Sequence, residues 1–172
     1  CGSAATVEKS DQQAFIDSLL STMSLEAKVG EMTQLTLGAI LQKEKKQIIE
    51  PQDFDSLRAA EALIQYQVGS ILNCGDHAHT PAKWHEFITG IQERAALKET
   101  RIPVLYGIDA IHGQTYTSGA VLGPQQIGLA ATWNEELVRK NAAATAKQVA
   151  ACGIPWNFSP ALDLGRDPRW PR

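Results

Sequence analysis

Charged side chains follow two apolar stretches of the sequence, and their types suit the binding of a sugar. They are Asp109 and His112 after IPVLYGI, and Asp163, Arg166, Asp167 and Arg169 after IPWNFSPAL. A carboxylate or a guanidinium can hold two neighbouring hydroxyl groups at once, as sugar recognition requires. The same residue types also have purely local roles, because aspartate caps turns and aspartate–arginine pairs brace loops. Residue type alone leaves both possibilities open.

The sequence has no pattern typical of a metal site, a nucleotide site or a serine nucleophile. Its four histidines, at positions 77, 79, 85 and 112, show neither the i, i+4 pairing of a helical zinc site nor cysteines at zinc-ligand spacing. GxGxxG, GxSxG and the phosphate-binding loop do not occur. We therefore expect no metal and no cofactor.

The balance of charge argues against a nucleic-acid partner. Sixteen basic and nineteen acidic side chains give a formal net charge of −3, and they form no long block of one sign. Nucleic-acid binding requires a basic patch, which this pattern does not provide. No apolar run approaches the roughly 18 residues that span a bilayer.

Strand and helix patterns alternate along the chain. The runs VGSILNCG, IPVLYGI and IPWNFSPALDL predict buried strands. Pro81 begins a helix before the second run, with Trp84, Phe87, Ile88 and Ile91 on one face. Asn134 caps another that ends at Gly153, with Val138, Ala142, Ala146 and Val149 facing inward. Alternation of this kind predicts a parallel α/β fold, whose ligand sites lie at the carboxyl ends of the strands. Asp109 and the later charged cluster are thus expected on one face.

Two short helices are predicted to open the fold. Phe15, Leu19 and Met23 share a helical face, and Ser24 is a plausible N-cap for a second helix over SLEAKVGEMTQL. The polar stretch ILQKEKKQIIEPQDF reads as a loop before a helix with apolar positions Leu57, Ala60, Leu63 and Ile64.

The first residue, Cys1, is followed by small and then polar residues, as at the mature end of a bacterial lipoprotein. This interpretation predicts a lipid anchor on Cys1, a location in the bacterial periplasm or outer membrane, a flexible tether over residues 1–13 and a domain over residues 14–172. The alternative is that the sequence starts on a cysteine by chance. Cys74 and Cys152 are either a disulfide pair or buried free thiols.

Two long segments closely resemble glycoside hydrolase family 3, especially its bacterial β-glucosidases. They are IPVLYGIDAIHGQTYTSGAVLGPQQIGLAATWNEELV and GIPWNFSPALDLGRDPRWPR, and LLSTMSLEAKVGEMTQL matches the family's earlier signature. The resemblance implies that residues 14–172 are the N-terminal portion of a (β/α)8 TIM-type barrel, incomplete in this chain. Gly123 stands where the family usually has a bulky apolar residue, and Pro171 where glycine is commoner.

The resemblance also implies roles for individual residues. Asp109 and Arg166 match positions that bind the sugar ring, whereas His112, Asp167 and Arg169 match positions that shape and brace the pocket. The implied substrate is a β-linked oligosaccharide or glucoside, and the implied enzyme is a retaining β-glucosidase. Alternatives are a β-xylosidase, a β-N-acetylglucosaminidase or a non-catalytic carbohydrate-binding protein.

The nucleophile and the acid/base of such an enzyme are expected beyond residue 172. The 172-residue chain by itself is therefore expected to be inactive, because retaining hydrolysis needs both carboxyl groups. Its last strand would be unpaired on one side, which predicts self-association of the isolated chain.

Overall fold

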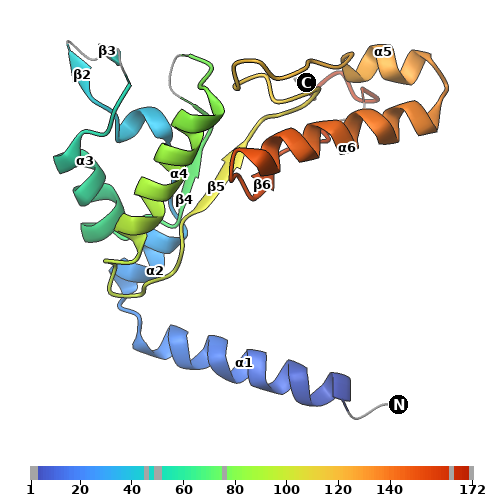
Figure 1. Cartoon of the computed structure of the whole chain (residues 1–172). Helices are drawn as coiled ribbons and strands as arrows, with labels where there is room; N and C mark the ends of the chain where they lie inside the picture. Colours follow the sequence, from blue (N-terminus) through green and yellow to red (C-terminus); the bar gives the residue numbers. More distant parts are fainter. Residues whose placement is uncertain (1–3, 45–46, 49–51, 75–76, 163–164, 171–172) are drawn as a thin grey trace.

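A four-stranded parallel sheet forms the centre of the computed structural model, which describes residues 4–44, 47–48, 52–74, 77–162 and 165–170 (Figure 1). Its strands are β1 (Gln34–Thr36), β4 (Ser70–Leu72), β5 (Leu105–Ile108) and β6 (Trp156–Asn157), in that order across the sheet. The strand order never reverses, so the sheet is singly wound, as in a (β/α) barrel, rather than doubly wound. The predicted parallel α/β fold is confirmed.

Helices fill each connection between neighbouring strands. α3 (Ser56–Ala60) continues into the π-helical turn η2 (Glu61–Gln65) before β4, and α4 (Pro81–Ala95) lies between β4 and β5. α5 (Gln126–Ala131) and α6 (Glu135–Ala151) lie between β5 and β6. The predicted starts of two helices are confirmed, because Pro81 is the first residue of α4 and the Asn134 side chain accepts a hydrogen bond from the Leu137 amide at 3.0 Å.

The core lies between α4 and the sheet. Trp84, Phe87 and Ile91 of α4 are fully buried, as is Tyr106 of β5. The Trp84 and Tyr106 rings meet edge to face, with their centroids 5.8 Å apart. Large rings that are removed from water in this way supply much of the stability of a small domain. The predicted inward face of α4 is therefore confirmed at Trp84, Phe87 and Ile91, whereas Ile88 is half-buried.

The helix predicted from Ser24 to Leu35 is shorter than expected. α2 spans Leu25–Glu31, with the Ser24 hydroxyl accepting from the Ala27 amide as predicted, and Gln34–Thr36 form strand β1 instead. β1 pairs with β4, and the Gln34 side chain donates to Ser70 Oγ at 2.7 Å. Such a short strand depends on its partner 36 residues away, which no local pattern reveals.

The following stretch is likewise not a simple loop. It contains a 3-10 turn, η1 (Leu37–Ala39), and two short antiparallel strands, β2 (Lys43–Glu44) and β3 (Gln47–Ile48). Leu37, Ile40 and Leu41 are fully buried, so this segment contributes to the core.

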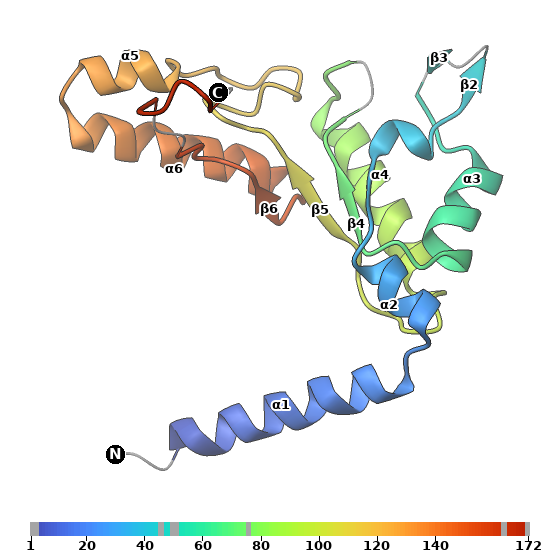
Figure 2. The same ribbon diagram turned by 180° about the vertical axis from the view of Figure 1, so that it is seen from behind.

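Helix α1 (Ala4–Thr22) stands away from the sheet in both views (Figures 1 and 2). It includes residues 4–13, which the sequence assigns to a flexible tether, and Phe15 on it is 68% exposed. Cys1 lies outside the described residues. Cys74 and Cys152 are reduced and form no disulfide with each other. No helix in the described ranges has the length and apolar character needed to cross a membrane.

The inward face predicted for α6 is only partly covered. Val149 is buried, but Val138 is 42% exposed, and both Ala142 and Ala146 are exposed as well. These three line a cavity of about 360 Å³ together with Ile111, Asn157 and Pro160. The face thus points toward the segments after β5 and β6, which do not fill it.

Gly107 in β5 allows β6 to approach closely. A Cβ atom at this position would lie 2.3 Å from the Phe158 ring, which packs edge to face on Trp156. We therefore predict that Gly107→Ala lowers the free energy of unfolding by about 1–3 kcal/mol, measured by urea denaturation. The control is Gly128→Ala in α5, where the nearest atom would be 4.0 Å away. It should stabilise the protein by about 0.5–1 kcal/mol, and equal effects of the two changes would contradict this account.

Candidate functional site

The candidate site lies at the carboxyl end of the sheet. Asp109 directly follows β5, Asn73 and Cys74 follow β4, and Asn157 is the last residue of β6. Because the strands are parallel, their carboxyl ends meet at one edge, where ligands bind in such folds. The structure thus places Asp109 where the sequence predicted it.

The Asp109 carboxylate is available to a ligand. Asp109 is partly exposed, although its neighbours Ile108 and Ala110 are fully buried. Within the described part of the chain, no hydrogen bond or ion pair engages its side chain. An ionised carboxylate can accept about four hydrogen bonds, so Asp109 keeps its full capacity to bind hydroxyl groups.

Tyr116 lies close enough to Asp109 to be affected by its charge. Burial raises the pKa of the Tyr116 phenol, and the negative charge of Asp109 and the nearby Cys74 raise it further. The three side chains come from the loops after β4 and β5. An aromatic ring, a thiol and a carboxylate thus come from loops at the same end of the sheet, close enough for their charges to interact.

The proximity of Asp109 and Tyr116 can be tested by titration. A phenolate is disfavoured beside a negative charge, so Asp109→Asn should lower the pKa of Tyr116 toward its ordinary value. The measurement is the ultraviolet titration of the phenols, with Tyr116 assigned by its loss in Tyr116→Phe. Glu136→Gln is the control, because that carboxylate pairs with Arg139 on the exposed face of α6. An unchanged Tyr116 titration in Asp109→Asn would disprove the proximity.

The loop after Asp109 closes on itself through His112. The His112 ring donates from Nδ1 to the Gly123 carbonyl at 3.0 Å, and the Gly123 amide donates to the His112 carbonyl at 2.7 Å. A Cβ atom on residue 123 would lie 1.8 Å from Asn141 Oδ1. The departure from the family pattern at Gly123 is therefore matched by the side chain of Asn141.

The same loop is fastened to its surroundings on two sides. Gly113 and Gln114 donate their amides to Thr145 Oγ1 and Gln148 Oε1 of α6, both at 2.9 Å. On the other side, the Tyr116 carbonyl accepts from the His79 amide at 2.9 Å and from the Trp84 indole at 3.1 Å. Hydrogen bonds thus connect the loop that follows Asp109 with α6, with α4 and with the loop after β4.

The charged segment near the C-terminus is exposed. Asp167 and Arg169 form an ion pair with a shortest N–O distance of 2.6 Å, and this pairing lowers the pKa of Asp167 and raises that of Arg169. The exposed Arg166 has no hydrogen bond or ion pair with any described residue, so no such contact joins it to Asp109. Asp163 and Pro171 lie outside the described residues. The segment lies at the same end of the molecule as the loop after β5 (Figures 1 and 2).

Asn157 is a residue of this site that the sequence did not single out. Its side chain accepts a hydrogen bond from the Ala110 amide and donates one to the Ala110 carbonyl, each at 3.0 Å. Asparagine near a strand end ordinarily indicates a turn, so the sequence offered no signal for this contact.

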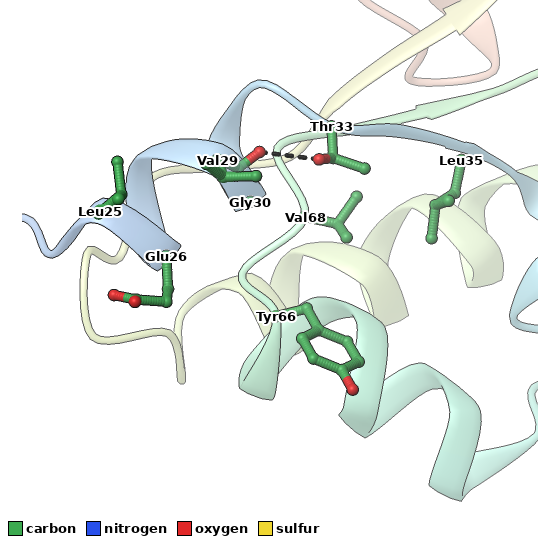
Figure 3. Close-up of a pocket in the computed structure, with 8 residues that line it drawn as sticks. All are labelled: Leu25, Glu26, Val29, Gly30, Thr33, Leu35, Tyr66 and Val68. Atoms are coloured by element: carbon green, nitrogen blue, oxygen red, sulfur yellow. Dashed lines mark hydrogen bonds between the residues drawn. The ribbon is translucent and has the colours of Figure 1, made fainter.

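A second cavity, larger than the one beside α6, lies at the amino end of strands β1 and β4, opposite to Asp109 (Figure 3). It measures about 550 Å³ and is lined mainly by apolar side chains, including Leu25, Val29, Leu35, Tyr66 and Val68. Glu26 is its one ionisable carboxylate, and Thr33 at its rim donates to the Val29 carbonyl at 2.7 Å. This cavity lacks the polar groups that would bind a sugar. Among the described residues, no cluster of His, Cys, Asp or Glu could hold a metal ion.

Comparison with known proteins shows the family of this chain. Residues 24–172 match the family described as "Glycosyl hydrolase family 3 N terminal domain". The chain is 36% identical to the lysosomal beta glucosidase of Dictyostelium discoideum, over 95% of this chain and 20% of that protein. It is 28% identical to the periplasmic beta-glucosidase of Salmonella typhimurium, over 94% of this chain and 18% of that protein.

The fold agrees as well. The chain matches the structure of a beta-glucosidase from Listeria innocua with a TM-score of 0.63 and 28% identity, over 93% of this chain and 19% of that one. The chain thus spans about a fifth of the length of these relatives. It belongs to glycosyl hydrolase family 3, and its four parallel strands are part of the TIM-type barrel of that family's N-terminal domain.

Proposed function

We propose that the whole protein is a retaining β-glucosidase that removes terminal β-D-glucosyl residues from oligosaccharides or glycosides. Relatives named beta-glucosidase, at 36% and 28% identity, support this assignment. The observation that carries it is Asp109, whose carboxylate follows the third strand of a family 3 barrel and has no partner among the described residues.

Asp109 and Arg166 hold the glucosyl ring in this proposal. The Asp109 carboxylate accepts hydrogen bonds from two adjacent hydroxyl groups, and the Arg166 guanidinium donates to hydroxyl oxygens of the same ring. His112 closes the loop that carries Asp109, and the Asp167–Arg169 pair shapes the segment that carries Arg166. Residues 1–172 thus supply the binding of the sugar rather than the bond cleavage.

Cleavage itself requires two further carboxyl groups. In a retaining glycosidase, a nucleophile and an acid/base lie about 5 Å apart on either side of the scissile bond. We assign both to parts of the whole protein outside residues 1–172. Hydrogen bonds from the ring hydroxyls to Asp109 strengthen as positive charge develops on the sugar, so this carboxylate also favours the transition state.

Two subsidiary proposals concern the location of the whole protein and the self-association of the isolated chain. We place the protein in the periplasm, as the Salmonella typhimurium relative is named, with a lipid on Cys1. Incorporation of labelled fatty acid that is lost in Cys1→Ser tests the anchor.

Self-association of the isolated chain is supported by exposed apolar residues such as Val138 and Met32. Light scattering of the purified chain tests it.

The test of the function is a comparison of aryl glycosides with the whole protein. The proposal predicts that kcat/KM for the β-glucoside exceeds that for the β-xyloside and the β-N-acetylglucosaminide by about tenfold or more. Nuclear magnetic resonance should show the β-anomer of glucose as the first product. Preference for either other sugar would reassign the substrate, and hydrolysis of none of the three would contradict the proposal.

A further inference from the structure

Strand β6 holds the backbone of Asp109 from both sides. On one side, Ile108 pairs with Asn157 in the sheet, and its carbonyl accepts from the Phe158 amide at 2.9 Å. On the other side, the amide and the carbonyl of Ala110 both bond to the Asn157 side chain at 3.0 Å. Asp109 therefore lies between two residues, Ile108 and Ala110, whose backbones are both hydrogen-bonded to β6 or to the residue after it.

The Asn157 side chain replaces the sheet pairing where the strands part. Backbone pairing between β5 and β6 ends at Ile108 and Asn157, yet Ala110 is fully buried and both its backbone groups need partners. A carboxamide carries one acceptor and one donor on adjacent atoms, like a peptide group, so it can satisfy both. An aspartate at position 157 could accept but not donate, and an apolar residue could do neither.

We infer that Asn157 is a positioning residue for Asp109: by fixing the backbone at Ala110, it fixes where the Asp109 carboxylate lies. The inference rests on the proposed function, because it assigns Asn157 a part in sugar binding. The Asp109 side chain has no hydrogen bond of its own within the described residues, so its direction depends on the backbone that carries it. Motion of the backbone at Ala110 would therefore displace the Asp109 carboxylate, which binds the hydroxyl groups in the proposed function.

The chain contains a matched control for this role. At the other end of β5, the Gln92 side chain donates to the Val104 carbonyl at 2.8 Å and accepts from the Val104 amide at 3.1 Å. Gln92→Ala removes the same two kinds of hydrogen bond, but from Val104, the residue just before β5, whereas Asp109 directly follows β5. This variant therefore shows how the loss of two such hydrogen bonds affects the kinetics when the surroundings of Asp109 are unchanged.

The first test is the steady-state kinetics of the whole protein on an aryl β-glucoside. Asn157→Ala should raise KM about tenfold and lower kcat/KM about thirtyfold, since binding is weakened in both the ground state and the transition state. Gln92→Ala should leave KM within twofold. Asn157→Asp, which keeps the size and the acceptor, should resemble Asn157→Ala. A KM within twofold of the unaltered protein in both Asn157 variants would overturn the inference.

The second test does not depend on activity. If Asp109 moves away when Asn157 is replaced, the pKa of Tyr116 should shift in the direction predicted for Asp109→Asn, whereas Gln92→Ala should leave it unchanged. A Tyr116 titration that is unchanged in Asn157→Ala would overturn the inference even if the protein hydrolysed no glycoside. Absence of hydrolysis by the unaltered protein would instead contradict the proposed function alone.

Discussion

Under the proposed function, we expect the replacement of Asp109 with alanine to lower kcat/KM of the whole protein for an aryl β-glucoside by about a thousandfold. Two hydrogen bonds from sugar hydroxyls to a carboxylate contribute about 1.5–3 kcal/mol each, and 1.4 kcal/mol corresponds to a factor of ten. No described residue forms a hydrogen bond or ion pair with this carboxylate. Its removal therefore costs only the hydrogen bonds to the sugar. Steady-state kinetics measure the effect.

The control for Asp109→Ala is the same change at Asp17. This carboxylate lies on the exposed helix α1 and, among the described residues, accepts a hydrogen bond from Gln13 alone, four residues away on the same helix. Asp17→Ala should leave kcat/KM within twofold of the unaltered protein. A fall of less than tenfold in Asp109→Ala would show that Asp109 does not hold the sugar.

The second large effect is on stability and concerns Lys98. Its ammonium group is fully buried and lies 3.0 Å from the Glu31 carboxylate, which also accepts from Thr100 Oγ1 at 2.9 Å. Lys98→Met removes the positive charge and leaves a largely buried carboxylate with the Thr100 hydroxyl. We expect the free energy of unfolding to fall by about 3–5 kcal/mol, measured by urea denaturation.

Two further variants test the cause of that loss. Arg139→Met breaks an ion pair of similar length, 2.7 Å, on the exposed surface of α6 and should leave the urea midpoint unchanged. Glu31→Met combined with Lys98→Met removes both charges and should recover part of the stability. A Lys98→Met protein as stable as Arg139→Met would contradict the account.

Features with a local cause could be predicted from the sequence. The N-caps at Ser24 and Asn134 and the start of α4 at Pro81 depend on neighbouring residues alone, and each is found where the sequence predicts it. The apolar run before Asp109 is typical of a strand covered on both faces, so the position of Asp109 at a strand end followed directly. Here the sequence and the structure agree because no distant contact is involved.

Features that depend on distant partners could not be predicted. Strand β1 exists because β4 pairs with it, and the fit of Gly123, which lies in a loop, depends on Asn141 in helix α6. Asn157 is separated by 47 residues from Ala110, the residue it holds, so nothing in its own neighbourhood marks it. The placement of Arg166 on the same face as Asp109 stays a prediction, since no hydrogen bond or ion pair among the described residues fixes the Arg166 side chain.

A crystal structure of the whole protein with glucose bound would test the central claim most directly. Our account predicts that the Asp109 carboxylate lies within about 2.5–3.2 Å of two adjacent hydroxyl oxygens of the sugar. It also predicts that the Ala110 backbone is still bonded to Asn157 in that complex. A glucose bound elsewhere, or an Asp109 turned away from the sugar, would contradict the account.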